Sequence, residues 1–189
     1  MNLDPTELLA RHREGLDFEA YLGTAPDRAV AWREIHRRVE LDATQSTLLE
    51  SFSRRMPVLV VSGIWCGDCA QQGPLLERIA EASGCIDLRW IDRDEHAEFS
   101  SKLRINGGDR VPVVVFMSED HEPVSVFGDR TLSRYRAMAV ERLGPSCPIP
   151  DAPIPQDALH ATLQDWLDEF ERVQLLLRLS PRLRARHGD

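Results

Sequence analysis

The sequence predicts an α/β fold: a mixed β-sheet flanked by helices, with a helical extension before the sheet and a further helix after it. Three observations support this prediction. Apolar runs at residues 58–61 and 113–117 indicate buried strands, a Cys-x-x-Cys motif opens a helix directly after the first run, and both terminal segments carry helix signals. A chain of 189 residues fits one domain with additions better than two independent domains.

The first part of the chain, residues 1–55, carries signals for four helices. Capping residues, prolines in the first turn and apolar residues one helical turn apart mark them. Aromatic residues at helical spacing most often pack against a core, so we expect these helices to cover the domain rather than to bind a ligand. In chain order the marking residues are Asp4 and Pro5; Phe18, Tyr21 and Gly23; Pro26 and Trp32; and Leu48, Leu49 and Phe52.

The strand expected at residues 58–61 leads into the most informative motif of the chain. This motif places two thiols, separated by two residues, at the start of a helix that should run to about residue 82. A thiolate there faces unpaired backbone N–H groups and the positive end of the helix dipole, which lower the pKa of the thiol. The second thiol, one turn on, can close a disulfide with the first. The motif is Trp65-Cys66-Gly67-Asp68-Cys69.

Such a cysteine pair can also form half of a zinc site, or be chemically inert. A structural zinc site would need a second close pair, but Cys85 and Cys147 stand alone and far apart. We therefore favour thiol chemistry, with a redox-active disulfide between Cys66 and Cys69 in place of any cofactor and with no bound metal. The charged run at residues 92–96 could be mistaken for metal ligands, but adjacent positions point in different directions and hydration accounts for it.

The remaining strands follow the expected active-site helix. Residues 86–90 alternate apolar and charged side chains, which is typical of a strand. A charged stretch then leads to a short helix containing Phe99 and Leu103, and a glycine-containing loop follows. Strands are expected at residues 113–117 and 123–127, and their short connection predicts an antiparallel hairpin, so the sheet should be mixed.

The C-terminal part begins with a proline-rich tract at residues 144–155 that cannot be regular helix and is expected to be an extended connector. Cys147 within it is more simply an incidental thiol than a third redox cysteine. From Gln156 a helix is expected with an apolar seam, which either the N-terminal helices of the same chain or a second copy would cover. We favour the first, and hence a monomer over a homodimer. The seam consists of Leu159, Leu163, Trp166, Phe170, Val173 and Leu177.

The chain resembles the thioredoxin superfamily over about residues 56–130. Thioredoxins carry Trp-Cys-Gly-x-Cys after a hydrophobic strand, often with a proline five residues later in the active-site helix, where this chain has Pro74. The segment containing Val111 and Pro112 is similar to the one in which thioredoxins hold a cis-proline opposite the disulfide. Gly128 is similar to the glycine that ends the last strand beside the same groove.

The resemblance implies a thioredoxin-like core at residues 56–130, a helical extension at residues 1–55 and a C-terminal helical extension at residues 131–189 packed on the core. It also implies a thiol:disulfide oxidoreductase that reduces protein or small-molecule disulfides and is itself reduced by an unidentified thiol reductant. Cys66 would attack the substrate disulfide, and Cys69 would then displace the reduced product.

Five further site residues follow from the same resemblance. Trp65, Gly67 and Asp68 would shape the surface around the attacking sulfur. Val111 would offer backbone hydrogen bonds to an extended substrate segment. Pro112 would hold that backbone and keep metal ions away from the thiols.

The sequence departs from the family pattern at two positions. Many thioredoxins have a buried acidic residue six positions before the first cysteine, where it assists proton transfer, but this chain has Val60 there. Asp68, in a position where thioredoxins commonly have proline, is the nearest candidate for a proton acceptor. Its charge would raise the pKa of the neighbouring thiol and favour a reducing protein. Equally, Asp68 could be a solvated carboxylate favoured by the helix dipole.

Composition limits the partners. A formal net charge of −8 disfavours nucleic acid and anionic membranes, because both attract clustered positive charge. The sequence has no long apolar run and no apolar signal core at its start, so we expect a cytoplasmic protein without a membrane anchor. An alternative function is a binding module or adaptor that uses its extra helices to recognise a partner, since fold does not fix function.

Overall fold

The computed structural model of the chain describes residues 3–143 and 157–188. The expected connector at residues 144–155, with Cys147, lies outside these described residues. None of the described helices combines the length and the apolar character needed to cross a bilayer.

A mixed four-stranded sheet forms the centre of the fold. Its strands are β1 (Met56–Ser62), β2 (Ile86–Asp92), β3 (Val113–Met117) and β4 (Pro123–Gly128), in the spatial order β2-β1-β3-β4. β1 pairs in parallel with β2 and antiparallel with β3, and β3 and β4 form an antiparallel hairpin. The predicted mixed sheet and the predicted hairpin are therefore confirmed.

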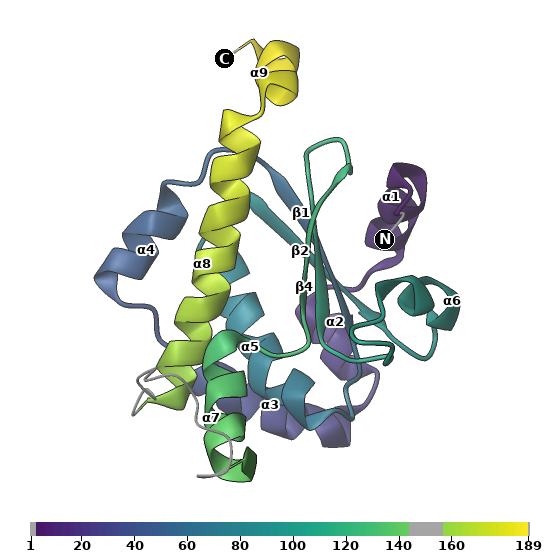
Figure 1. Ribbon diagram of the computed structural model, residues 1–189, viewed down its shortest axis with the longest axis vertical. Helices are drawn as coiled ribbons and strands as arrows, with labels where there is room; N and C mark the ends of the chain where they lie inside the picture. The colour runs from purple at the N-terminus through teal and green to yellow at the C-terminus, as the bar shows by residue number, and fades with distance from the viewer. Residues whose placement is uncertain (1–2, 144–156, 189) are drawn as a thin grey trace.

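Helices cover both faces of this sheet, with α5 and α8 on one side and α1 and α6 on the other (Figure 1). The four N-terminal helices and the active-site helix lie where the sequence predicts them, whereas α7 and α9 were not expected. The helices are α1 (Pro5–Glu14), α2 (Phe18–Gly23), α3 (Pro26–Arg38), α4 (Ala43–Glu50), α5 (Gly67–Glu81), α6 (Ala97–Ser100), a 3₁₀ turn (Ser101–Leu103), α7 (Leu132–Leu143), α8 (Ala158–Leu179) and α9 (Pro181–His187).

An aromatic cluster joins the N-terminal helices to the sheet. Tyr21 of α2 stacks on Trp90 of β2, with ring centroids 5.6 Å apart, and Trp32 of α3 meets both rings edge-on. Trp32 also packs on Gly73 of α5, where a Cβ atom would lie 2.2 Å from the indole ring. Its indole N–H donates to the Ile64 carbonyl at 3.2 Å, so α3 supports the loop that precedes the cysteines.

The apolar seam of α8 packs within the same chain. Phe170 meets Phe116 of β3 and Trp166 meets Phe127 of β4, each pair edge-on with ring centroids 5.0 Å apart. The expectation that the N-terminal helices cover this seam is largely wrong, because the sheet and α5 do so instead. The N-terminal helices contribute a polar contact at the edge, a 2.9 Å hydrogen bond from Gln45 to Gln164.

Candidate active site

The two cysteines lie at the N-terminal end of α5 in different environments. Cys66 is the N-cap residue and is half-buried, whereas Cys69, in the first turn, is fully buried. Both thiols are free. The first helical turn therefore presents one sulfur near the surface and holds the other behind it.

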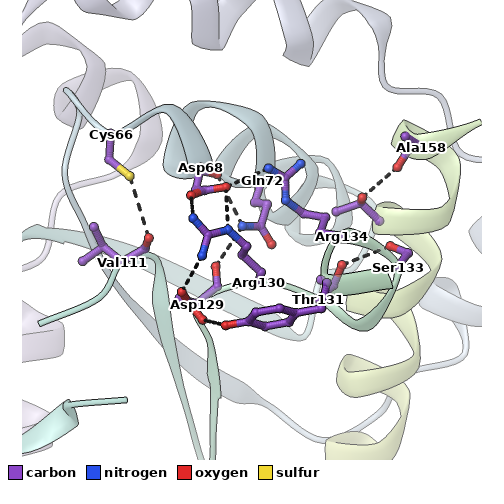
Figure 2. Close-up of polar contacts among 12 residues, drawn as sticks. Cys66, Asp68, Gln72, Val111, Asp129, Arg130, Thr131, Ser133, Arg134 and Ala158 are labelled. Carbon is purple, nitrogen blue, oxygen red and sulfur yellow. Dashed lines mark hydrogen bonds and ion pairs between the residues drawn. The ribbon is translucent and has the colours of Figure 1, made fainter. Parts of the chain in front are cut away.

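A loop containing a cis-proline lies opposite Cys66, as the family resemblance implied. The Val111–Pro112 peptide bond is cis, and the Cys66 Sγ atom lies 3.8 Å from the Val111 carbonyl oxygen (Figure 2). Gly128 ends β4 against this loop with φ at +153°, and a Cβ atom there would lie 2.3 Å from the Pro112 carbonyl oxygen. A glycine is thus required for the close approach of β4 to the loop.

Trp65 forms the exposed side of the site. Its side chain is 45% exposed and lies over Gly63, where a Cβ atom would come within 2.7 Å of the indole ring. The Arg93 guanidinium carbon lies 4.6 Å from the ring centroid, in cation–π geometry. Beside Trp65 is a cleft of about 390 Å³, also lined by Tyr21 and Asp92. An exposed aromatic face next to a cleft is a suitable surface for an extended segment.

The two thiols have opposite pKa shifts. The pKa of Cys66 is lowered to about 6, mainly by a hydrogen bond from the Cys69 thiol and also by the backbone N–H groups of Cys69 and Asp68. Burial raises the pKa of Cys69, and so does its interaction with Cys66. Near neutral pH, Cys66 is therefore a thiolate and Cys69 a thiol, so the Cys66 sulfur is the more nucleophilic of the two.

The reactivity of Cys66 should depend on pH accordingly. We expect its alkylation by iodoacetamide to rise with pH and to level off above about pH 7, because only the thiolate reacts. An ordinary thiol, with a pKa of about 8.5, would continue to gain rate to about pH 9. Cys69→Ala should move the midpoint upward, since it removes the largest contribution to the low pKa. Mass spectrometry of the Cys66 peptide measures the alkylation rate of the wild-type protein and of Cys69→Ala at each pH. A wild-type midpoint near that of an ordinary thiol would contradict the lowered pKa of Cys66.

Asp68 is held between two arginines that sequence analysis did not identify. Figure 2 shows its carboxylate between the guanidinium groups of Arg130 and Arg134, with contacts of 3.1 Å to Arg130 Nε and 2.7 Å to Arg134. The interpretation of Asp68 as a solvated carboxylate is therefore wrong. Its charge does act to raise the pKa of Cys66, but two ion pairs oppose that effect. The only sequence signal for this ion-pair cluster was the four-residue spacing of Arg130 and Arg134.

The same network anchors the end of β4. The nearly buried Asp129 carboxylate accepts from Arg110 and Arg130 at 3.0 Å each, and from the Tyr135 hydroxyl. The Asp129 carbonyl accepts at 2.9 Å from the amide of Gln72 on α5. The network thus ties the start of α5, the end of β4 and the start of α7 together around Cys66.

We expect the arginines to control the Cys66 pKa through Asp68. Replacing Arg130 and Arg134 together by glutamine should raise that pKa by about one unit, because the Asp68 charge is then unopposed. Asp68→Asn should lower the Cys66 pKa, and the decrease should be larger in the protein whose two arginines are already replaced. Alkylation profiles of the four proteins measure this coupling. Equal effects of Asp68→Asn in both backgrounds would show that the arginines do not screen Asp68.

Within residues 3–143 and 157–188, no group of three or more His, Cys, Asp or Glu side chains is arranged to hold a metal ion. The charged run at residues 92–96 makes local contacts instead. The Asp92 side chain accepts from the backbone N–H groups of Asp94 and Glu95 at 2.8 and 3.3 Å. Arg93 is paired with Asp94 at 2.8 Å.

Comparison with known proteins gives the same fold. A protein of unknown function from Pseudomonas aeruginosa is 17% identical, with a TM-score of 0.69 over 91% of this chain and 97% of that one. An HIV epitope scaffold is 20% identical, with a TM-score of 0.59 over 97% of this chain and 98% of that one. At these identities the likeness concerns the fold alone. The sequence profile of the family described as thioredoxin matches residues 15–141. Because that match spans most of the chain and includes both cysteines and the proline loop, the chain belongs to the thioredoxin family.

Proposed function

We propose that this protein is a thiol:disulfide oxidoreductase that works in the reducing direction. The observation that carries the proposal is the pair of unlike thiols at the start of α5. One is accessible, opposite the Val111 carbonyl and largely ionised at neutral pH, and the other is buried and protonated. A nucleophilic thiolate backed by a resolving thiol is the arrangement that disulfide exchange needs.

The reaction has two steps. The Cys66 thiolate attacks one sulfur of the substrate disulfide, which forms a mixed disulfide and releases the other substrate sulfur as a thiolate. Cys69 then attacks Cys66, the Cys66–substrate bond breaks, and the substrate leaves fully reduced while a Cys66–Cys69 disulfide forms. Two electrons pass from the protein to the substrate, and an external thiol reductant returns them.

The reducing direction is supported by the pKa of Cys66. Its value of about 6 is close to the ~7 of thioredoxin itself and far from the ~3.5 of strongly oxidising proteins, in which the thiolate is much more stable. Substrates would be protein or small-molecule disulfides, bound beside Trp65, Gly67 and Asp68 and along the backbone of Val111 and Pro112. A cytoplasmic location would suit this role, since thiol reductants are maintained there.

The proposal is tested with purified protein, a dithiol as electron donor and a protein disulfide as substrate. We expect catalytic turnover, and a midpoint potential near −270 mV, whereas a value above about −150 mV would indicate an oxidant. No turnover, together with a stable partner that binds through the additional helices, would instead favour the adaptor. Tightly bound zinc with unreacted thiols would favour a metal-binding protein.

A further inference from the structure

Two buried hydroxyl groups lie next to Cys69 without hydrogen-bond partners. Ser62 is the last residue of β1 and is fully buried, and Tyr21 of α2 is 1% exposed. Among the residues that the structure describes, neither hydroxyl makes a hydrogen bond. Burying a polar group in this way destabilises a fold, so these two hydroxyls call for an explanation.

Both hydroxyls are close enough to the cysteines to affect them. Burial raises the pKa of Cys69, and the Ser62 hydroxyl and the Gly63 N–H oppose that shift. Burial likewise raises the pKa of Tyr21, and the negative charges of Cys69, Asp92 and Cys66 raise it further. A hydrogen-bonding effect of Ser62 acts in the opposite direction and lowers the Tyr21 pKa. The Ser62 hydroxyl thus acts on the pKa of both the Tyr21 phenol and the Cys69 thiol, although it makes no hydrogen bond to a described residue. The titratable groups that act on Cys69 or on Tyr21 beside it are Cys66 at the N-cap of α5 and Asp92 at the end of β2.

The second step of the proposed reaction needs a hydrogen-bond donor beside the Cys69 sulfur. Cys69 must become a thiolate as it attacks Cys66, and a buried thiolate without a donor is costly. Among the described residues, no carboxylate is free for this role. The Asp92 side chain already accepts from the backbone N–H groups of Asp94 and Glu95. Val60 occupies the family position of the buried acid, and Asp68 is engaged by two arginines. Glu77 lies about 12 Å further along α5 and accepts from the Trp90 indole N–H at 3.4 Å.

We propose that Ser62, positioned by Tyr21, donates a hydrogen bond to the Cys69 thiolate as that thiolate forms, and so promotes release of the reduced substrate. This inference rests on the proposed function. In this step the Tyr21 hydroxyl donates to Ser62 Oγ and the Ser62 hydroxyl donates to Cys69 Sγ, two bonds that are not made beforehand. Cys69 gives up its proton and bonds to Cys66 as the Cys66–substrate bond breaks. The proton ends on the departing substrate thiol, so no other reactant is needed.

The surroundings of Tyr21 suit a fixed donor. Its ring is stacked on Trp90 and held edge-on by Trp32, with centroids 5.6 and 5.8 Å away. The phenol hydroxyl therefore keeps its place relative to the end of β1. A serine hydroxyl, in contrast, rotates freely about one bond and can accept from Tyr21 while it donates to sulfur.

The test separates the two chemical steps. A symmetrical aromatic disulfide whose released thiolate is coloured gives one signal when Cys66 attacks and a second when Cys69 resolves the mixed disulfide. Ser62→Ala should leave the first release unchanged and slow the second about tenfold or more, the usual effect of losing a hydrogen bond to a charged group. The pH midpoint of the second release should also move upward by about one unit in this variant.

Two further variants make the test specific. Tyr21→Phe keeps the aromatic packing and removes only an unpaired hydroxyl, so the protein should fold normally while the second release slows. Ser118→Ala is the control, because Ser118 is also a buried serine, with 1% of its surface exposed. It follows β3 at the end of that strand far from the cysteines. The control variant should alter neither step.

The outcomes separate this inference from the proposed function. A normal first release with an unchanged second release and pH midpoint in Ser62→Ala and Tyr21→Phe would overturn the role of the hydroxyls alone. Equal slowing of both releases would also overturn it, because it would indicate general disruption. Failure of the wild-type protein to give a first release would overturn the proposed function and this inference with it.

Discussion

Cys66→Ser is expected to reduce disulfide reduction to the uncatalysed rate, and Cys69→Ser is expected to trap the protein as a mixed disulfide with its substrate. The serine hydroxyl is a poor nucleophile near neutral pH, so without Cys66 no mixed disulfide can form. Without Cys69 the first step still occurs, but no second thiol is poised behind Cys66 to displace the product. Turnover assays and non-reducing electrophoresis measure the two results.

Cys85→Ser is the matched control for these variants. Cys85 is half-buried directly before β2, and its thiol donates to the Phe52 carbonyl at 3.1 Å, at the end of β1 that lies away from Cys66. This variant should retain full turnover, and Cys147→Ser should do so as well if that thiol is incidental. If Cys66→Ser formed the mixed disulfide and Cys69→Ser did not, the order of attack would be the reverse of the one proposed.

Phe170→Ala is expected to lower the free energy of unfolding by about 3–5 kcal/mol, the usual cost of removing a buried phenylalanine ring. Phe170 is fully buried, and its ring lies 5.0 Å from that of Phe116 at the centre of the sheet. The lost ring leaves a cavity between α8 and β3 that rigid neighbouring strands cannot fill. Denaturant titration followed by circular dichroism measures the loss.

Leu176→Ala provides the control on the same helix. This side chain is 42% exposed, so its loss should change the free energy of unfolding by about 0.5 kcal/mol or less. The wild-type protein should unfold in one transition, because α8 shares the core of the sheet. A similar small effect for both variants, or a separate transition for α8, would show that the helix is not part of the cooperative unit.

Features that depend on neighbouring residues could be predicted from the sequence. Asp4 was expected to cap the first helix, and its side chain accepts from the N–H groups of Thr6 and Glu7. The apolar run before Cys66 forms β1, and the short connection after β3 forms a hairpin. Capping, side-chain periodicity and short loops act over a few residues, so a local stretch of sequence contains the information that they need.

The electrostatics of the candidate site needed the tertiary structure. The ion pairs of Asp68 join residues 62 and 66 positions apart, and the buried Ser62 hydroxyl acts on the pKa of Tyr21, a residue of a separate helix. Likewise, the apolar seam of α8 showed that a partner was needed but not that the sheet would supply it.

The sequence by itself thus determined the order of the four strands and of the helices other than α7 and α9, and the placement of two thiols at the start of a helix. Only the tertiary structure decided which charges and hydroxyls surround those thiols. The physical reason is that contacts between residues far apart in the sequence depend on how the helices and strands pack together. Many packing arrangements are compatible with the same local sequence pattern.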